Sequence, residues 1–194
     1  MSYGDQPICE FLDNVASERV TPAGGSAAAL VGAIGTALCE MVCLHTIGKT
    51  GYADVEEEMA EIHEDLMKQR GVLLDLADKD AEVVDELLVA YRDESDQTVA
   101  MKKATGVPLT IAEACLSVVE HATVVSEKGN RNAVPDAGTG SFLVYSALQA
   151  SIFTVRSNLN RLSDSEFTEE MEARAAAIEQ SAELEFERVL SNVE

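Results

Sequence analysis

The stretch TPAGGSAAALVGAIGTALCEMVCLHTIGK, residues 21–49, constrains the fold more than any other part of the chain. A proline and two glycines open it, and turns rich in Ala, Gly, Ser and Thr follow. Small side chains let helix backbones approach closely, whereas a glycine inside a helix costs about 1 kcal/mol relative to alanine. Gly32 and Gly35 therefore need a packing reason. We expect a helix over 26–48 that is central in the fold or part of a tight subunit interface.

The rest of the chain reads almost entirely as helix. Apolar residues recur at spacings of three and four from Asp54 to about Tyr91, which predicts one long amphipathic helix. Further helical stretches are expected over 5–19, from RDESDQ to Thr105, and over 109–127, 137–160 and 166–192, with breaks at Gly106, at Pro108 and in the loop 129–138. We therefore predict an all-α fold, a single-domain bundle of long antiparallel helices over residues 1–194.

Size and composition fit one globular domain. The chain has 194 residues, of which 46% are hydrophobic and 25% charged. Its four cysteines are not spaced evenly as in a disulfide framework, and the opening MSYGDQPICEF lacks the basic and apolar regions of a secretory leader. We therefore expect a cytoplasmic protein with reduced thiols. Segments 27–47 and 137–155 are strongly apolar, but polar residues interrupt both. We expect buried helices and no membrane contact.

The charge of the chain is far from balanced. Its formal net charge is −21, which argues against a nucleic-acid partner and resembles the composition of halophilic proteins. Acidic residues outnumber basic ones sixteen to four over 53–97 and ten to two over 162–194. Residues 20–52 carry only Glu40 and Lys49, and residues 98–161 hold six basic against four acidic residues. Burial or an anionic ligand would each explain these two non-acidic stretches.

One acidic residue falls on the apolar side of the long helix. The stripe that passes through Leu73, Leu76 and Ala77 continues at Asp80. A carboxylate on a core-facing stripe must be paired, ligated or functional, and its pKa is expected to be perturbed. Pairing with a buried arginine is as consistent with the pattern as a catalytic role.

The start of the small-residue helix also allows two interpretations. Gly24, Gly25 and Ser26 present backbone N–H groups and a hydroxyl where an anion or a carbonyl oxygen could bind. On this motif alone, a plain helix start with Ser26 as N-cap is the favoured interpretation.

The other candidates have simple structural roles of their own. Asp136 follows a proline where a helix begins, so capping is its simplest role. Asn130 and Asn132 suit a turn. Arg156 and Asn158 come near a helix C-terminus, where an arginine complements the helix dipole.

Two familiar motifs are excluded, and no metal site is expected. GKTGY is no phosphate-binding loop, because Cys43 stands where a glycine is required and a helix precedes it. The spacing of Cys39, Cys43 and His45 does not suit structural zinc. A helical metal–carboxylate protein would need Glu-x-x-His ligands, which the residues around His63 do not supply.

Four segments together resemble the cyclodeaminase/cyclohydrolase family, which comprises the cyclodeaminase domain of formiminotransferase-cyclodeaminase and stand-alone methenyltetrahydrofolate cyclohydrolases. They are residues 21–49, LADKDAEVVDELL, GNRNAVPDAG and TVRSNL, in the family's order. The resemblance implies an all-helical homodimer that acts on one-carbon tetrahydrofolates near its subunit interface, with no tightly bound cofactor. This sequence departs from the usual family pattern at two places: its opening TPAGGS is shorter than the usual TPxPGGGS, and Pro135 stands in place of a serine.

The resemblance also implies site residues and a reaction. Catalytic roles fall on Asp80, Lys49 and Asp136, and substrate-binding roles on Gly24, Gly25, Ser26, Asn130, Asn132, Arg156 and Asn158. The expected reaction is hydrolysis of 5,10-methenyltetrahydrofolate to 10-formyltetrahydrofolate, because no fused transferase hands over a formimino group. The alternatives are a formimidoyltetrahydrofolate cyclodeaminase that releases ammonia and a folate-binding protein without turnover.

Overall fold

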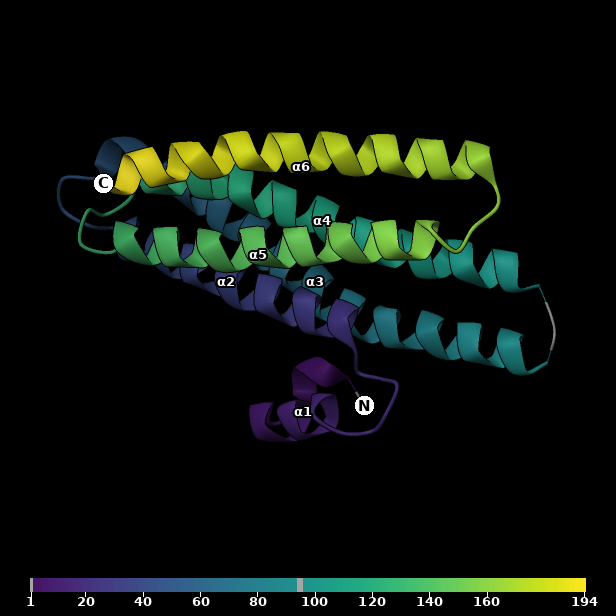
Figure 1. The fold of residues 1–194 in the computed structure, drawn as a ribbon. Coiled ribbons are helices and arrows are strands. Elements are labelled where there is room, and N and C mark those ends of the chain that lie inside the picture. The colour runs from purple at the N-terminus through teal and green to yellow at the C-terminus, as the bar shows by residue number, and fades with distance from the viewer. Residues whose placement is uncertain (1, 94–95) are drawn as a thin grey trace.

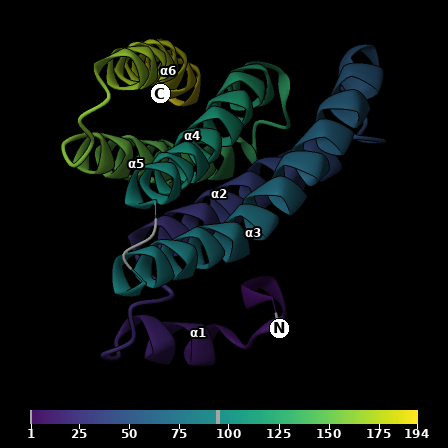
Figure 2. The ribbon, with the colours of Figure 1, turned by 90° about the vertical axis from the view of Figure 1, so that its right-hand side faces the viewer.

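The computed structural model describes residues 2–93 and 96–194. In these ranges the elements are the 3₁₀ turn η1 (Tyr3–Asp5), α1 (Ile8–Val15), α2 (Gly24–Thr46), the 3₁₀ turn η2 (Ala53–Val55), α3 (Glu56–Arg92), α4 (Gln97–Lys128), α5 (Val134–Leu159) and α6 (Ser165–Val193). No strand occurs among them, which confirms the all-α prediction. The long helices α2 to α6 form the bundle, and the short α1 stands apart on the side of α2 and α3 (Figures 1 and 2).

Helix α2 is central, as its small residues predict. It packs against α3 on one side and α5 on the other, and it also touches α4. A Cβ added to Gly35 would lie 2.5 Å from the carbonyl oxygen of Gly140 on α5, and one added to Gly140 would lie 2.6 Å from the carbonyl oxygen of Gly35. The two backbones meet here with no room for a side chain. This close approach is the packing reason for the glycine in mid-helix.

Helix α3 follows its predicted boundaries closely and buries the predicted stripe. Met59, Ile62, Leu66 and Leu73 are all buried against the core, at spacings that place them on one face of the helix. Asp80 continues this face and is only 4% exposed. The expectation that a carboxylate points inward from α3 is therefore confirmed.

Helix α4 corrects the sequence analysis. A break was expected at Gly106 and Pro108, but one helix runs from Gln97 to Lys128 with Pro108 inside it. Proline has no N–H to donate to the carbonyl four residues earlier, which leaves Ala104 O without its helical partner. The side-chain amide of Asn158 on α5 donates to that oxygen at 2.9 Å. A distant side chain thus replaces the missing hydrogen bond and lets the helix continue.

Other boundaries shift by a few residues. The helix expected over 5–19 is limited to α1, eight residues long. The loop expected over 129–138 is shorter, because α5 begins at Val134. Within RDESDQ, residues 94 and 95 lie outside the described residues, and Asp96 caps α4 by accepting the N–H groups of Thr98 and Val99.

In the part of the chain that the structure describes, two helices have the length and composition of a membrane span. They are α2 and α4, and 56% of each apolar window is buried inside the bundle. The second of them differs from the predicted segment, which was 137–155. Core helices of a bundle pass the same test, so this feature is weak evidence for a membrane.

Candidate functional site

The N-terminal end of α2 is held by a carboxylate from α3. Helix α2 starts at Gly24, and its N-cap residue, Ala23, contributes no side-chain hydrogen bond. Asp80 Oδ2 accepts the backbone N–H of Ser26 at 2.8 Å and the Ser26 hydroxyl at 3.0 Å. The expectation that Ser26 is the N-cap is therefore wrong, because the helix begins two residues earlier and Asp80 caps it from another helix. The alternative expectation, that Asp80 pairs with a buried arginine, is also wrong for the residues that the structure describes.

Gly25 is required by this arrangement. A Cβ at position 25 would collide with the Asp80 carboxylate. The Gly-Gly-Ser start therefore lets a carboxylate sit directly against the helix backbone, where the positive end of the helix dipole favours a negative charge. We name Gly24, Gly25, Ser26 and Asp80 the Asp80 cluster.

The surroundings of Asp80 suit a group that gains and loses a proton. Burial raises the pKa of its carboxyl above the ordinary value, and the hydrogen bonds from Ser26 partly oppose this by favouring the charged form. Oδ1 makes no hydrogen bond with any residue in the described part of the chain and is not among its fully enclosed polar atoms. One oxygen is thus fixed by Ser26 while the other is free to meet a ligand.

Tyr3 lies beside the Asp80 cluster, and sequence reasoning missed it. Burial, followed by the nearby carboxylates of Asp78, Asp85 and Asp80, raises the pKa of Tyr3, while a hydrogen bond with Thr21 lowers it. The Tyr3 N–H donates to Asp78 Oδ1 at 2.7 Å, which ties η1 to α3. No motif marked this residue, because the contact joins the chain terminus to a position 75 residues away.

Lys49 lies just past the other end of α2. Gly48 and Gly51 flank it with φ of 69° and 92°, a left-handed backbone that glycine adopts at little cost, so the chain turns sharply here. Lys49 is exposed and makes no ion pair with the residues that the structure describes. Its charge is therefore available to a ligand.

The loop before α5 is pinned to this same end. Asn130 is 4% exposed; its N–H donates to the Thr46 hydroxyl at 2.9 Å and its side-chain amide donates to His45 O at 2.8 Å. Its Oδ1 accepts the N–H of Asn132 at 3.1 Å. These contacts fix the position of Asn130 through one amide N–H and the carbonyl oxygen of its side chain, and its substrate-binding role stays a prediction. The exposed Asn132 and Asp136 follow it, and with Lys49 and Asn130 they form what we name the Lys49 cluster.

Tyr52 is a second residue of this end that sequence reasoning missed. Its hydroxyl accepts the backbone N–H of Arg131 at 3.0 Å and so joins the turn after α2 to the loop before α5. A cavity of about 720 Å³ opens beside it, lined in part by Lys128, Arg131 and Pro135. The only sequence feature that could have pointed to Tyr52 was the presence of an aromatic residue directly after GKTG.

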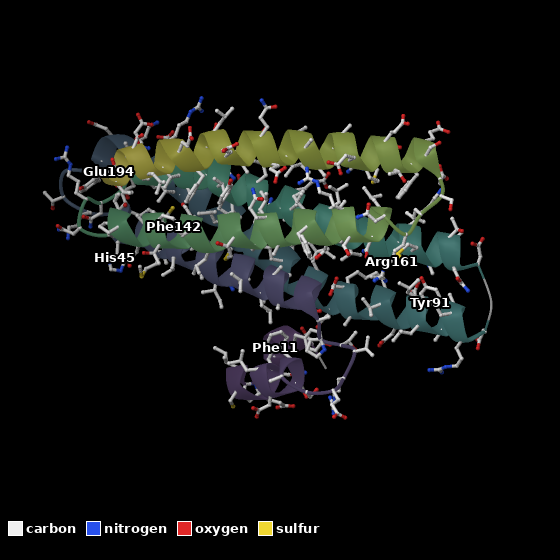
Figure 3. The ribbon with its side chains drawn as sticks, in the orientation of Figure 1. Phe11, His45, Tyr91, Phe142, Arg161 and Glu194 are labelled. Carbon is white, nitrogen blue, oxygen red and sulfur yellow. The ribbon has the colours of Figure 1, made fainter. Side chains whose placement is uncertain are left out.

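The two clusters lie at opposite ends of one helix. Helix α2 spans 23 residues, which is about 34 Å at 1.5 Å per residue. Figure 3 shows His45, whose carbonyl holds Asn130, at one end of the bundle and Tyr91 and Arg161 at the other. Within a single chain the structure therefore does not bring Asp80 together with Lys49 and Asp136.

Arg156 and Asn158 join neither cluster. Arg156 donates from Nε to Glu172 and from Nη2 to Glu179, both on α6, at 3.0 Å. Asn158 donates to Ala104 O on α4. Both side chains have structural partners within the chain, and their substrate-binding roles stay a prediction. Among residues 2–93 and 96–194, no group of three or more His, Cys, Asp and Glu side chains is placed to hold a metal ion.

A sequence profile of the family described as Formiminotransferase-cyclodeaminase matches residues 7–177, most of the chain. The chain belongs to this family. Among its curated relatives, the methenyltetrahydrofolate cyclohydrolase of Methylorubrum extorquens is 38% identical in an alignment that covers 86% of this chain and 86% of that protein. The formimidoyltransferase-cyclodeaminase of Rattus norvegicus is 25% identical in an alignment that covers 98% of this chain but 37% of that protein.

A solved structure agrees with the fold of this family member over almost its whole length. The crystal structure of a formiminotetrahydrofolate cyclodeaminase from Thermotoga maritima superposes with a TM-score of 0.95 and 32% identity, covering 98% of this chain and 96% of that one. The resemblance read from the four sequence segments is therefore confirmed.

Proposed function

We propose that this chain is a methenyltetrahydrofolate cyclohydrolase, which hydrolyses 5,10-methenyltetrahydrofolate to 10-formyltetrahydrofolate. The observation that carries the proposal is Asp80, a buried carboxylate with a raised pKa. One of its oxygens is held by Ser26, and the other has no partner within residues 2–93 and 96–194. The cyclohydrolase relative, similar over 86% of both chains, favours this activity. No bound cofactor is needed, since water and the folate are the only reactants.

The chemistry assigns Asp80 the role of general base. Water adds to the cationic carbon that joins N5 and N10, and the proton it loses passes to Asp80 Oδ1. The negative carboxylate also stabilises the positive amidinium before attack. The tetrahedral carbon then opens when its bond to N5 breaks and the hydroxyl proton moves to N5. The formyl group stays on N10, and one proton is released per turnover.

The Lys49 cluster supplies the second proton transfer. In its ammonium form Lys49 donates a proton to N5 as the ring opens and recovers one from the hydroxyl. Asp136, exposed in the first turn of α5, orients the pterin ring or shares this transfer. These roles require both clusters at one substrate.

We further propose that a homodimer completes the site. Two copies related by a two-fold axis, with their α2 helices running in opposite directions, would place the Asp80 cluster of one copy beside the Lys49 cluster of the other. The roughly 34 Å length of α2 is what supports this arrangement, since one chain cannot bring the clusters together. The exposed apolar residues Ile34 and Leu44 of α2, 54% and 57% exposed, give the copies a surface to share.

The same proposal covers the remaining properties of the chain. A single domain over residues 1–194 is supported by its shared core. Antiparallel long helices are supported by the hydrogen-bonded pairs Gln69–Ser117 and Glu86–Lys103, because the residue number rises along α3 from one pair to the next while it falls along α4. A cytoplasmic location is supported by four free cysteines, of which Cys39, Cys43 and Cys115 are buried. We propose no nucleic-acid or membrane partner.

The first test follows the loss of the near-ultraviolet methenyl absorbance in molar salt, against the rate without protein. We expect a clear acceleration that falls by about 100-fold or more in Asp80→Asn, the range that removal of a general base produces. A folded Asp80→Asn variant with full turnover would contradict the role of Asp80. Ammonia release from the formimidoyl compound, without hydrolysis of the methenyl compound, would instead establish the cyclodeaminase. Binding of the folate without either reaction would identify the chain as a folate-binding protein without turnover.

The second test asks whether the site is shared between copies. Asp80→Asn and Lys49→Met are each expected to be inactive. Mixed in equal amounts and allowed to exchange subunits, they form hybrid dimers with one intact site, so about a quarter of the wild-type activity should return. The control mixes Asp80→Asn with Ser26→Ala/Asp80→Asn, which share the same damaged cluster and should regain nothing. No recovery in the Lys49 mixture, despite proven exchange, would place the site within one chain.

A further inference from the structure

We propose that Tyr52 is a positioning residue of the reaction: its hydroxyl fixes the exposed turn after α2 and so holds Lys49 where it can give its proton to N5. This inference rests on the proposed function and adds a residue that takes no part in the proton transfers themselves. Tyr52 acts through Lys49 and needs no contact with the folate. We name residues 48–51 the Lys49 turn.

The Lys49 turn has little packing of its own. Residues 48–51 are all exposed, and a Cβ added to either of its two glycines would meet nothing within 4 Å. Its backbone hydrogen bonds are local: the Lys49 N–H donates to Thr46 O at 3.1 Å, and the Tyr52 N–H donates to Lys49 O at 3.1 Å. These bonds set the shape of the turn, but they do not fix the turn against the rest of the bundle.

A single contact ties this segment to a distant part of the chain. Within the described residues, one hydrogen bond joins 48–54 to another segment, and it is the bond that the Arg131 N–H donates to the Tyr52 hydroxyl at 3.0 Å. The loop on the other side of this bond is firmly held, because the buried Asn130 donates its N–H to the Thr46 hydroxyl at 2.9 Å. The loop is therefore the anchor, and the Lys49 turn is what the bond holds.

A cavity leaves this hydrogen bond without support from close packing. The space of about 720 Å³ is lined by Gly51, Tyr52 and Asp54 on one segment and by Gly129 and Arg131 on the other. Atoms that border open space lack the close contacts that fix side chains and loops in a packed interior. The position of the Lys49 turn therefore depends on the hydroxyl of Tyr52.

The position of Lys49 matters because of the role proposed for it. A proton donor must come within hydrogen-bond reach of the atom that it protonates, and misplacement by about 1 Å can cost around 100-fold in rate. In the part of the chain that the structure describes, no ion pair fixes the Lys49 ammonium. The backbone of the turn alone sets where this side chain starts.

The first experiment removes the hydroxyl with Tyr52→Phe and follows amide exchange by nuclear magnetic resonance. We expect the Arg131 N–H to exchange about 10-fold faster or more, while the Asn130 N–H, bonded to Thr46, is unchanged and serves as the internal control. Arg131 is exposed, so water replaces the lost acceptor and the circular dichroism should stay that of wild type. Unchanged exchange at Arg131 would overturn the proposal.

Turnover of the same variant tests the consequence for the reaction. The kcat for methenyl hydrolysis should fall by about 10- to 100-fold with KM unchanged, because Lys49 acts in ring opening and not in binding. The matched control is Tyr91→Phe, the same change at a residue that is 46% exposed and lies at the other end of the bundle from His45 (Figure 3). Its kcat and KM should be those of wild type. A Tyr52→Phe variant with wild-type kcat, or with only KM changed, would overturn the positioning role.

The second experiment asks whether Tyr52 acts through Lys49. Single-turnover measurements, with protein in excess over the methenyl compound, give the slow residual rate of Lys49→Met. Adding Tyr52→Phe should leave this residual rate unchanged, because a proton donor that is absent cannot be misplaced. An equal fold-loss from Tyr52→Phe in the wild-type and Lys49→Met backgrounds would show that Tyr52 acts independently of Lys49 and would overturn the proposal.

The positioning role and the proposed function fail in different measurements. A wild-type protein without methenyl turnover would overturn the proposed function, and the positioning role would fall with it. Normal turnover by wild type, together with an unchanged kcat in Tyr52→Phe, would overturn the positioning role alone.

Discussion

The two carboxylate oxygens of Asp80 have different surroundings. Oδ2 accepts two hydrogen bonds from Ser26, and Oδ1 accepts none among residues 2–93 and 96–194. Because the pKa of the folded state is raised, stability decreases as the pH rises from the unfolded pKa through the folded pKa, and the ionised carboxylate costs folding free energy above that range. Asp80→Asn should therefore fold at neutral pH. A carboxylate kept at such a cost fits a functional role better than a stabilising one.

Ser26→Ala should move the pH profile of the reaction. Removing the hydroxyl takes away a hydrogen bond that favours ionised Asp80, so the pKa of Asp80 rises further. The base is active when ionised, and the acid limb of kcat/KM should shift to higher pH while the plateau is largely kept. Steady-state rates across the pH range measure this. Ser141→Ala, which removes a buried hydroxyl bonded to Ala137 O in α5, is the control. An unmoved limb would mean that another group titrates.

Gly25→Ala should disable the site by displacing Asp80. The added Cβ would occupy the position of the carboxylate, and misplacement of a reacting group by about 1 Å can cost around 100-fold in rate. We expect a loss of that order in kcat/KM, measured with the methenyl absorbance. Gly71→Ala on α3, where a Cβ meets nothing within 4 Å, should retain activity and gain up to about 1 kcal/mol in stability. Full activity of Gly25→Ala would show that Asp80 has no fixed position to keep.

At the scale of elements, the continuity of α4 depends on α5. Pro108 removes one helical hydrogen bond and Asn158 replaces it at Ala104 O. A buried carbonyl without a partner costs about 1–3 kcal/mol. The residue that the family resemblance assigns to substrate is therefore also a structural residue here. The two roles make different predictions for its replacement.

Asn158→Leu should lower the free energy of unfolding by about 1–3 kcal/mol, because Ala104 O loses its donor. Pro108→Ala restores an N–H to that carbonyl, so the same Asn158→Leu change should cost less in that background. Urea unfolding of the four proteins in a double-mutant cycle gives the coupling energy. Equal costs in both backgrounds, together with a raised KM, would assign Asn158 to the substrate instead.

For the whole molecule, the acidic charge is concentrated on two helices, α3 and α6. The acidic stretches 53–97 and 162–194 contain all of α3 and all of α6, whereas α2 is nearly free of charge. Repulsion between these carboxylates opposes the compact state at low ionic strength. Salt at about 1 M shortens the screening length to about 3 Å and removes most of this repulsion.

The melting temperature should therefore rise with KCl up to molar concentrations. Each kcal/mol recovered corresponds to about 2–4 °C for a chain of this size, and thermal denaturation followed by circular dichroism measures it. Glu169→Gln with Glu170→Gln, both exposed on α6, should raise the melting temperature at low salt and reduce the salt effect. A melting temperature that does not depend on salt would show that the net charge of −21 costs the fold nothing.

The sequence by itself determined what depends on local pattern. The period of Met59, Ile62 and Leu66 set the buried face of α3 and predicted that Asp80 points inward, because neighbours three and four apart share one side of a helix. The small residues of α2 predicted a central helix, since only close backbone packing justifies them. The four family segments gave the fold class and the reaction type.

Only the tertiary structure decided which distant residues meet. Asp80 accepts the N–H of Ser26 across 54 positions, Asn158 donates to Ala104 O across another 54, and Asn130 donates to Thr46 across 84. Such contacts leave no periodic signal in the chain, because they depend on how whole helices pack. The same packing put the Asp80 and Lys49 clusters at opposite ends of α2. The sequence already placed Ser26 and Lys49 at opposite ends of one helix, which its rise per residue keeps apart. Only the packing of α3 against α2 decided that Asp80 lies at the Ser26 end.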